Sequence, residues 1–547
     1  MNLLKTAATI SGLTLLSRIT GLVRETLTAA TFGAGSQTDA FFVAFRLPNL
    51  LRRLFAEGAF SQAFVPVLGQ IRAQQGESAA LTLARQCALV MTAVLALVCL
   101  LAIMGAPVLV WMMSGGFDGD SKTFALSVML TRWMFPYILL ISLVALASGV
   151  LNTWSEFKAP AFAPVLLNLS FIAAALLLAP HLDEPIWALA IAVVAGGIAQ
   201  LALMGVALKK ALSRSLSTQR SDHTSSGSIS DSGSGSVLNP NASPREHPWS
   251  IRAAWRDPSV RRIMVLMLPA TMAVSVAQIS LIINTHIAAR LQAGSVSWLS
   301  FADRLMEFPT ALLGVALGTV LLPSLTKANS ENNPQEVSRL IDWGLRLVAI
   351  LAIPSAVGLA VLSIPLTAVL FHYGQFDHQD LVMTAQAMVG YAVGLVGLIA
   401  IKVLAPGFYA KQEVKTPVKI ALFALALTQA LNLVFVPLFA HAGLALATSL
   451  AACANALLLY LGLRRKAIYT PDRGWLGFII KIVISAFIMG LAIGMIALEL
   501  DWSGLAAAPW LRITWLAVIL FVAAIVYFSV LRLLGVRWMQ FLKKDKA

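Results

Sequence analysis

Charged and polar side chains interrupt a strongly apolar stretch near the start of the chain. One helical face, at spacings of three or four residues, carries Arg46, Asn49, Arg53, Glu57 and Ser61. Arg52 lies beside this face, about 100° around the helix axis. Asp39 precedes the stripe at the start of the same segment. Side chains of this kind can hold an anion, pair with one another, or gate a polar cavity.

Two further segments carry the same residue types. The segment that precedes the stripe has its own polar face, formed by Ser11, Thr14, Arg18, Gly21, Glu25 and Thr28, and Arg24 widens it. Far along the chain, another apolar segment begins with Asp303, Arg304 and Glu307.

An arginine at the centre of a lone membrane helix costs about 2.5–3.5 kcal/mol. Three arginines on two neighbouring helices, without enough acids to neutralise them, therefore indicate a cationic cavity: Arg18, Arg24 and Arg52. Guanidinium groups bind diphosphate oxygens bidentately, so the pattern favours a phosphorylated anion. Three alternatives remain. Arg53 and Glu57 can neutralise each other, Arg46 can serve packing or topology, and Arg52 can extend with Arg53 toward the cytoplasm.

The composition sets the elements that must position these residues. The chain has 547 residues, is 59% hydrophobic and only 12% charged, and has a mean hydropathy of +0.82. These values predict an all-α polytopic membrane protein. Fourteen segments have spanning length: 8–32, 38–70, 80–112, 123–152, 158–180, 185–210, 259–291, 297–325, 336–371, 380–409, 415–439, 441–463, 475–499 and 509–535.

The distribution of charge predicts the topology. The net charge is +15, and the basic residues gather in alternate connections while acids gather in the others. This pattern is typical of basic cytoplasmic loops rather than of a nucleic-acid partner, and it places both termini in the cytoplasm. The sequence contains no GxxxxGK[ST], no HExxH and no nucleophile–His–acid set. We therefore expect a transporter without an ATP-binding motif, with no catalytic residue, no metal site and no cofactor.

An internal repeat divides the chain. SEFKAP (155–160) matches QEVKTP (412–417) at an offset of 257, and two other short matches follow at nearly the same offset. Six segments separate the equivalents, so the two halves are parallel repeats. We predict a six-helix lobe over 1–210, a disordered Ser/Gly-rich cytoplasmic tether over 211–257, and a second six-helix lobe over 258–465. Two extra helices and a basic tail follow over 466–547.

Four stretches together resemble the MurJ/MviN family of lipid II flippases. They are DAFFVAFRLPNLLRRLFAEGAFSQAFVP (39–66), SWLSFADRLMEFP (297–309), GVALGTVLLPSL (314–325) and APGFYAKQEVKTPVKIA (405–421). The resemblance covers nearly the whole chain outside the tether. It implies the exporter fold of two six-helix lobes, with two C-terminal helices that form a groove for a lipid tail.

The resemblance also implies a function. The family moves lipid II, the undecaprenyl-diphosphate-linked peptidoglycan precursor, from the inner to the outer leaflet of the bacterial cytoplasmic membrane by alternating access. Its essential cavity positions match Arg18, Arg24, Asp39, Arg52 and Arg304. Glu25 stands where some members have aspartate, and the long tether departs from the family's compact loop. We class Arg18, Arg24, Arg52 and Arg304 as diphosphate-binding, and the following residues as cavity or gating: Asp39, Glu25, Arg53, Glu57 and Glu307.

Two other functions remain open. One is a drug or cation antiporter of the same superfamily, which should line its cavity with unpaired acids and aromatic residues. The other is a membrane scaffold for cell-wall synthesis, in which single arginine changes spare transport. The expected partners are lipid II, bilayer lipids and cell-wall synthesis proteins. Either the membrane potential or an ion gradient could drive transport, and the sequence does not distinguish them.

Overall fold

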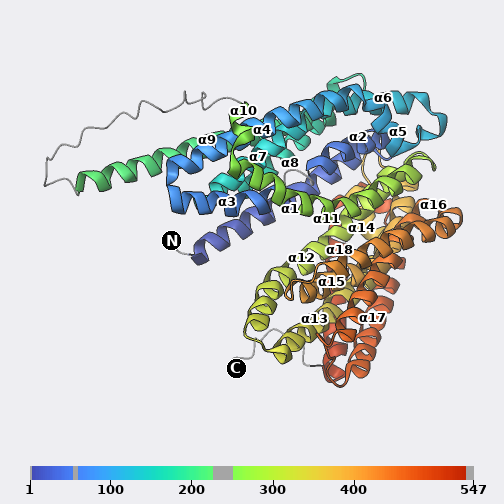
Figure 1. The fold of residues 1–547 in the computed structure, drawn as a ribbon. Helices are drawn as coiled ribbons and strands as arrows, with labels where there is room; N and C mark the ends of the chain where they lie inside the picture. Colours follow the sequence, from blue (N-terminus) through green and yellow to red (C-terminus); the bar gives the residue numbers. More distant parts are fainter. Residues whose placement is uncertain (1–2, 53–58, 226–250, 537–547) are drawn as a thin grey trace, which may run out of the picture. The chain divides into compact units, whose positions relative to one another are not determined.

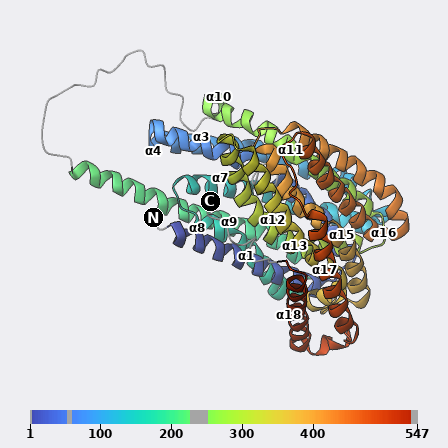
Figure 2. The same ribbon diagram turned by 90° about the horizontal axis from the view of Figure 1, so that it is seen from below.

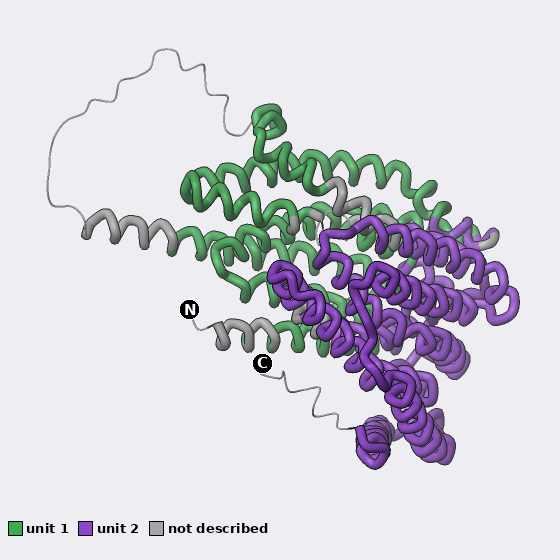
Figure 3. The backbone as a smooth tube through the Cα atoms, turned by 60° about the horizontal axis from the view of Figure 1, so that its bottom comes forward, with its two compact units in different colours: residues 1–28, 43–112, 121–278 green, residues 29–42, 113–120, 279–547 purple. Residues whose placement is uncertain are grey.

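The computed structural model describes residues 3–52, 59–225 and 251–536, which form helices and connections without any strand (Figure 1). They fall into two compact units (Figure 3). Unit 1 contains residues 1–28, 43–112 and 121–278, and unit 2 contains residues 29–42, 113–120 and 279–547. The expectation of an all-helical membrane protein is confirmed.

The first part of the chain forms ten α-helices among the described residues. In chain order they are α1 (Leu3–Phe32), α2 (Ser36–Arg52), α3 (Ala59–Gln75), α4 (Glu77–Met104), α5 (Ala106–Ser114), α6 (Ser121–Met134), α7 (Tyr137–Thr153), α8 (Lys158–Ala173), α9 (Trp187–Ser225) and α10 (Ile251–Arg256). Between them lie two short 3-10 helices, η2 (Phe117–Gly119) and η4 (Ala179–His181), and a π-helical segment, η3 (Ala174–Leu178). Their core in unit 1 gathers around the stacked rings of Phe60 and Phe64.

The second part begins with α11, which starts in unit 1 and ends in unit 2. Its helices are α11 (Pro258–Ala289), α12 (Ser295–Ser330), α13 (Pro334–Val361), α14 (Ser363–Phe371), α15 (His378–Tyr409), α16 (Lys415–Arg465), α17 (Trp475–Leu498) and α18 (Pro509–Leu533), with the turn η5 (Gly504–Ala507) before α18. The last two helices are neighbours in unit 2 (Figure 2).

Nine helical stretches of the described residues are long and apolar enough to cross a membrane. The longest, α16, breaks at Ala440, where the backbone has φ 47° and ψ −126°. Gly443 permits this sharp reversal, because a Cβ there would lie 2.1 Å from the carbonyl oxygen of Phe435. The break coincides with the predicted boundary between 415–439 and 441–463. Four predicted segments are not among these nine stretches, and they correspond to α1, to α2 with α3, to α11 and to α12. The total of fourteen membrane crossings stays a prediction.

Small residues let α15 and α16 approach closely in unit 2. A Cβ at Gly394 would lie 2.5 Å from the Cα of Ser449, and one at Gly397 would lie 2.8 Å from the Cα of Cys453. Lipid tails are as apolar as leucine side chains, so membrane helices associate through close packing of this kind. The two helices form the centre of the unit 2 core with α12 and α13.

The internal repeat is visible in the hydrogen bonds of each unit. Ser155 and Gln412 both have positive φ, 61° and 57°. The residues that follow them make equivalent bonds, from Glu156 N to Leu151 O at 2.9 Å and from Glu413 N to Phe408 O at 3.0 Å. Each unit also has an equivalent bond from a side chain to a backbone carbonyl. Arg72 donates to the Thr153 carbonyl at 2.6 Å, and Asn329, 257 residues after Arg72, donates to the Ala410 carbonyl at 3.1 Å. Ala410 likewise follows Thr153 by 257 residues.

The predicted tether over 211–257 is too wide. Helix α9 continues to Ser225, and α10 covers Ile251–Arg256. The stretch 211–225 contains neither glycine nor proline, and extending an existing helix costs far less than starting one. Ala254 of α10 is buried in the unit 1 core. Residues 226–250 lie outside the described residues.

The compact units also differ from the predicted lobe boundaries at 210 and 258. Unit 1 extends to Gln278, and unit 2 includes residues 29–42, which are the end of α1, the connection after it and the start of α2. Two buried carboxylates, described below, bond this segment to the rest of unit 2. The two halves of the internal sequence repeat therefore do not coincide with the two compact units.

One buried carboxylate anchors α17 in unit 2. Asp342 of α13 is 2% exposed and accepts hydrogen bonds from the Tyr469 hydroxyl, the Trp475 indole and Arg346 Nε, each at 2.6 Å. The Arg346 guanidinium also lies 5.1 Å from the ring centres of both Trp475 and Phe478. This cluster, the Asp342 cluster, links the start of α17 and the connection before it to α13.

Candidate functional site

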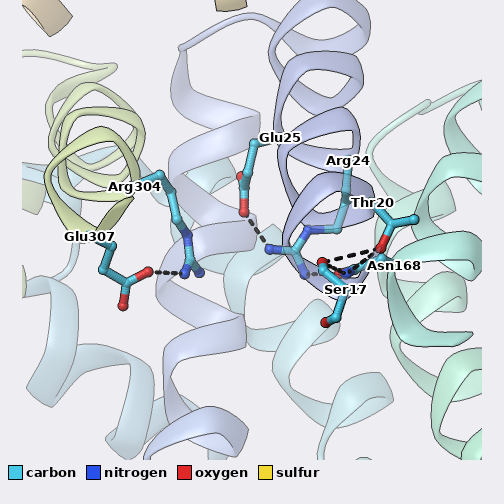
Figure 4. Close-up of polar contacts among 7 residues, drawn as sticks. All are labelled: Ser17, Thr20, Arg24, Glu25, Asn168, Arg304 and Glu307. Carbon is cyan, nitrogen blue, oxygen red and sulfur yellow. Dashed lines mark hydrogen bonds and ion pairs between the residues drawn. The ribbon is translucent and has the colours of Figure 1, made fainter. Parts of the chain in front are cut away.

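Arg24 is held on three sides in unit 1. Its Nη1 donates to Asn168 Oδ1 at 3.1 Å, and its Nη2 forms an ion pair with Glu25 Oε1 (Figure 4). Its guanidinium carbon also lies 5.2 Å from the centre of the Phe171 ring. The side chain is 15% exposed and that of Glu25 is 9% exposed. The charged group is thus largely buried and fixed in position, while part of it remains accessible.

Asn168 fixes this arrangement from α8. Its Nδ2 donates to the Ser17 carbonyl at 3.0 Å and to Thr20 Oγ1 at 3.2 Å, so its Oδ1 faces Arg24. Asn168 is not among the site residues predicted from the sequence. The available signal was an isolated amide within the apolar segment 158–180, since polar groups inside membrane helices are usually functional.

Arg52 lies at the end of α2 and is half-buried. Its Nε and Nη2 both donate to Asn49 Oδ1, at 2.9 and 2.8 Å. The buried Tyr137 of α7 interacts electrostatically with both Arg52 and Arg24. Both arginines lie in unit 1, and their shared role in binding a diphosphate stays a prediction.

The remaining predicted residues of the N-terminal stripes have different outcomes. Arg18 is exposed on α1. Arg53 and Glu57 lie outside the described residues, so their roles stay predictions. Glu25 neutralises Arg24 rather than standing alone in the cavity.

Arg304 and Glu307 form an ion pair on α12 in unit 2 (Figure 4). Arg304 Nη1 lies 2.9 Å from Glu307 Oε2, and the side chains are 40% and 42% exposed. An exposed pair of this kind contributes little to stability, so both groups can exchange partners readily. That Arg304 shares a cavity with Arg24 stays a prediction.

Asp39 has a structural position in unit 2. It is 3% exposed and accepts hydrogen bonds from Gly294 N at 2.7 Å, Ser297 N at 2.8 Å and Ser297 Oγ at 2.5 Å. A carboxylate at the start of a helix satisfies free N–H groups and the positive end of the helix dipole. Asp39 therefore caps α12, and its predicted role in gating stays a prediction.

A second carboxylate binds the connection between α1 and α2, just before Asp39 in the chain. Asp380 of α15 accepts from Ala34 N at 3.0 Å and from the Trp298 indole at 2.8 Å. The connection is also held by a bond from Gln375 N to Ala30 O at 2.8 Å. Asp39 and Asp380 together make residues 29–42 part of unit 2. The sequence analysis did not identify Asp380 or Trp298, because only the tertiary structure brings them to this connection.

Comparison with known proteins decides the family. A family model described as "Lipid II flippase MurJ" matches residues 28–509. The chain is 50% identical to the lipid II flippase MurJ of Burkholderia cenocepacia over 546 residues, covering all of both chains. The chain belongs to the lipid II flippase MurJ family. The resemblance inferred from the sequence is thereby confirmed.

Other MurJ relatives and solved structures agree with this assignment. The probable lipid II flippase MurJ of Haemophilus influenzae is 37% identical, with 97% of this chain and all of that protein covered. A solved lipid II flippase MurJ in an inward closed conformation superposes with a TM-score of 0.76 at 21% identity, covering 98% of this chain and 99% of that one. An inward-facing multidrug transporter of the MATE family superposes at 0.63 and 12% identity, covering 83% and 94%. At these identities the two structures show the shared fold alone.

Proposed function

We propose that this chain is a lipid II flippase of the bacterial inner membrane. It moves the undecaprenyl-diphosphate-linked precursor of peptidoglycan from the inner to the outer leaflet. Membership of the MurJ family supports this function, since its curated relatives bear the name lipid II flippase. The observation that carries the proposal is the partly buried Arg24, held by Asn168 and Phe171 and neutralised by Glu25.

The geometry of Arg24 suits a diphosphate. A guanidinium has five N–H donors, and the bonds to Asn168 and Glu25 leave others available. A diphosphate offers more acceptor oxygens and more negative charge than the single Glu25 carboxylate. In this account Glu25 neutralises Arg24 until substrate arrives, and the diphosphate then competes with it for the same guanidinium.

The alternative of a cation antiporter has less support in the described residues. Such a transporter needs acids that are free to bind a cation. Glu25 in unit 1 and Glu307 in unit 2 are each paired with an arginine of their own unit. The surroundings of Arg24 in unit 1 are therefore better suited to an anion than to a cation.

Alternating access is the proposed route. Solved proteins that share the fold include a MurJ in an inward closed conformation and MATE transporters in inward-facing and outward-facing conformations. The membrane potential or an ion gradient drives the cycle in this proposal. An interior-negative potential favours outward movement of negative charge by about 2.3 kcal/mol per charge per 100 mV.

Expression of this chain should restore growth to a bacterium depleted of its own lipid II flippase. It should also prevent accumulation of lipid-linked precursor, because the proposed activity removes that precursor from the inner leaflet. The measurement is growth together with the amount of lipid II per cell after depletion. An empty vector is the control, and membrane levels of the chain are checked by blot. A chain that reaches the membrane but leaves growth and precursor unchanged would exclude the proposed function.

The proposed orientation places both termini and the connection between α16 and α17 in the cytoplasm. After replacement of Cys87, Cys99 and Cys453 by alanine, an impermeant thiol reagent should label Ser36→Cys and Ala507→Cys in intact cells. It should label Lys466→Cys only after the membrane is opened. All three positions lie in or next to connections between predicted spans. Labelling of Lys466→Cys from outside would reverse the topology.

A further inference from the structure

Arg512, in the first turn of α18, is a fully buried arginine that the proposed transport site does not use. Its side chain is 0% exposed. Its Nη1 donates to the carbonyls of Ala368 at 2.8 Å and His372 at 3.1 Å, at the end of α14. Its guanidinium carbon lies 5.4 Å from the centre of the Tyr373 ring. One edge of the guanidinium thus caps α14, and one face rests on an aromatic ring.

The other edge of the same guanidinium has no hydrogen-bond partner. Both Nε and Nη2 of Arg512 are buried and unpaired. In a guanidinium these two groups point the same way and form the fork that binds anions bidentately. Two further buried atoms on α14 and its C-terminal cap are also unpaired, Thr367 Oγ1 and His372 Nδ1. A hydroxyl and an imidazole nitrogen can both donate hydrogen bonds to an anion.

The charge at this junction is not balanced by a carboxylate. Arg512 forms no ion pair with any acid of the described residues. Burial first, and then the charges of Arg512 and His378, lower the pKa of His372, while Asp377 raises it. His372 is therefore neutral at pH 7 and adds no second positive charge. An uncompensated buried cation is costly, whereas a buried cation paired with an anion is tolerated.

We propose that the Arg512 fork binds a small monovalent anion of the halide class at the junction of α14 and α18. The hydroxyl of Thr367 and Nδ1 of His372 are its further donors. The complete burial of Arg512 favours an ion of this size over a phosphate or a lipid headgroup. One negative charge neutralises one guanidinium, and the bound ion fastens the start of α18 to the end of α14.

The test is thermal unfolding of the full-length protein in detergent, with sodium chloride or sodium gluconate at equal ionic strength. Chloride should raise the apparent melting temperature of the wild-type protein in a saturable way, because a ligand that binds only the folded state stabilises it. Arg512→Met should abolish the difference between the two salts. The matched control is Arg532→Gln, an exposed arginine near the end of the same helix, which should keep the wild-type response.

Two further measurements decide the case if Arg512→Met does not fold. Thr367→Val should raise the chloride concentration for half-maximal stabilisation by about tenfold, the cost of one hydrogen bond to a charged group. Crystals soaked in bromide should show anomalous density at the Arg512 fork.

Equal melting temperatures of the wild-type protein in chloride and gluconate would overturn the proposal. So would an unchanged chloride response in Thr367→Val together with no bromide at Arg512. Stabilisation by phosphate but not by chloride would replace the halide with an oxyanion and equally refute it.

Discussion

Replacing Arg24 by alanine should sharply reduce lipid II translocation while the amount of protein in the membrane changes little. The substitution removes the guanidinium that Asn168 and Phe171 hold in place. Charge-assisted hydrogen bonds contribute roughly 1.5–3 kcal/mol each, so the loss should weaken substrate binding about ten- to a hundredfold. Arg24→Lys should restore part of the activity, because an ammonium group keeps the charge but loses the planar fork.

Two companion variants separate a binding effect from a folding effect. Arg24→Ala removes the arginine partner of the largely buried Glu25 carboxylate, so the double variant Arg24→Ala with Glu25→Gln removes both charges of the pair. It should accumulate normally and still fail to translocate lipid II. The matched control is Arg214→Ala, which breaks the exposed Arg214–Glu156 ion pair of the same unit. That variant should behave as wild type, because an exposed pair contributes little. Normal translocation by Arg24→Ala would refute the diphosphate site.

Asp342→Ala should destabilise unit 2 by about 3–5 kcal/mol, the usual cost of removing one member of a buried ion pair. The change leaves Arg346 without its partner and removes the acceptor of the Tyr469 hydroxyl and the Trp475 indole. Burial first, and then the Asp342 carboxylate, raise the pKa of Tyr469 far above its usual range. The Tyr469 hydroxyl therefore remains a donor at any physiological pH. The loss of stability in Asp342→Ala should accordingly not vary with pH through ionisation of Tyr469.

The measurement is the apparent melting temperature of the purified protein, together with hydrogen exchange in the connection between α16 and α17. Both should report loosening of the Asp342 cluster. Glu336→Ala is the matched control, since Glu336 pairs with Arg339 on the exposed side of the same helix. Its effect should stay within about 0.5 kcal/mol. Equal losses of stability in the two variants would show that the Asp342 cluster does not anchor α17.

Periodicity and composition were enough to predict most of the helices. They predicted the break in α16, because two segments of spanning length meet at position 440, and they placed Arg52 beside Asn49 on one helix. They also predicted the repeat, which the equivalent bonds of Arg72 and Asn329 bear out. These features depend on residues that are close in sequence or on simple periodic patterns.

The partners of the charged residues could not be predicted in the same way. Asn168 bonds to Arg24 across 144 positions of sequence, and Ser297 bonds to Asp39 across 258. Neither spacing carries a periodic signal. Nothing in the sequence around Asp342 or Asp380 identifies their partners, and only the tertiary packing makes them buried acceptors. The predicted tether began too early in the chain. A polar composition does not prevent a helix from continuing through residues that lack glycine and proline.

The most direct measurement of the central claim is leaflet-resolved labelling of lipid II. Cells depleted of their own flippase would express either the wild-type chain or Arg24→Ala, at equal membrane levels. The lipid II accessible in the outer leaflet would then be quantified. The wild-type chain should restore outer-leaflet lipid II, and Arg24→Ala should leave it in the inner leaflet. Equal amounts of outer-leaflet lipid II with the two chains would show that Arg24 does not bind the substrate.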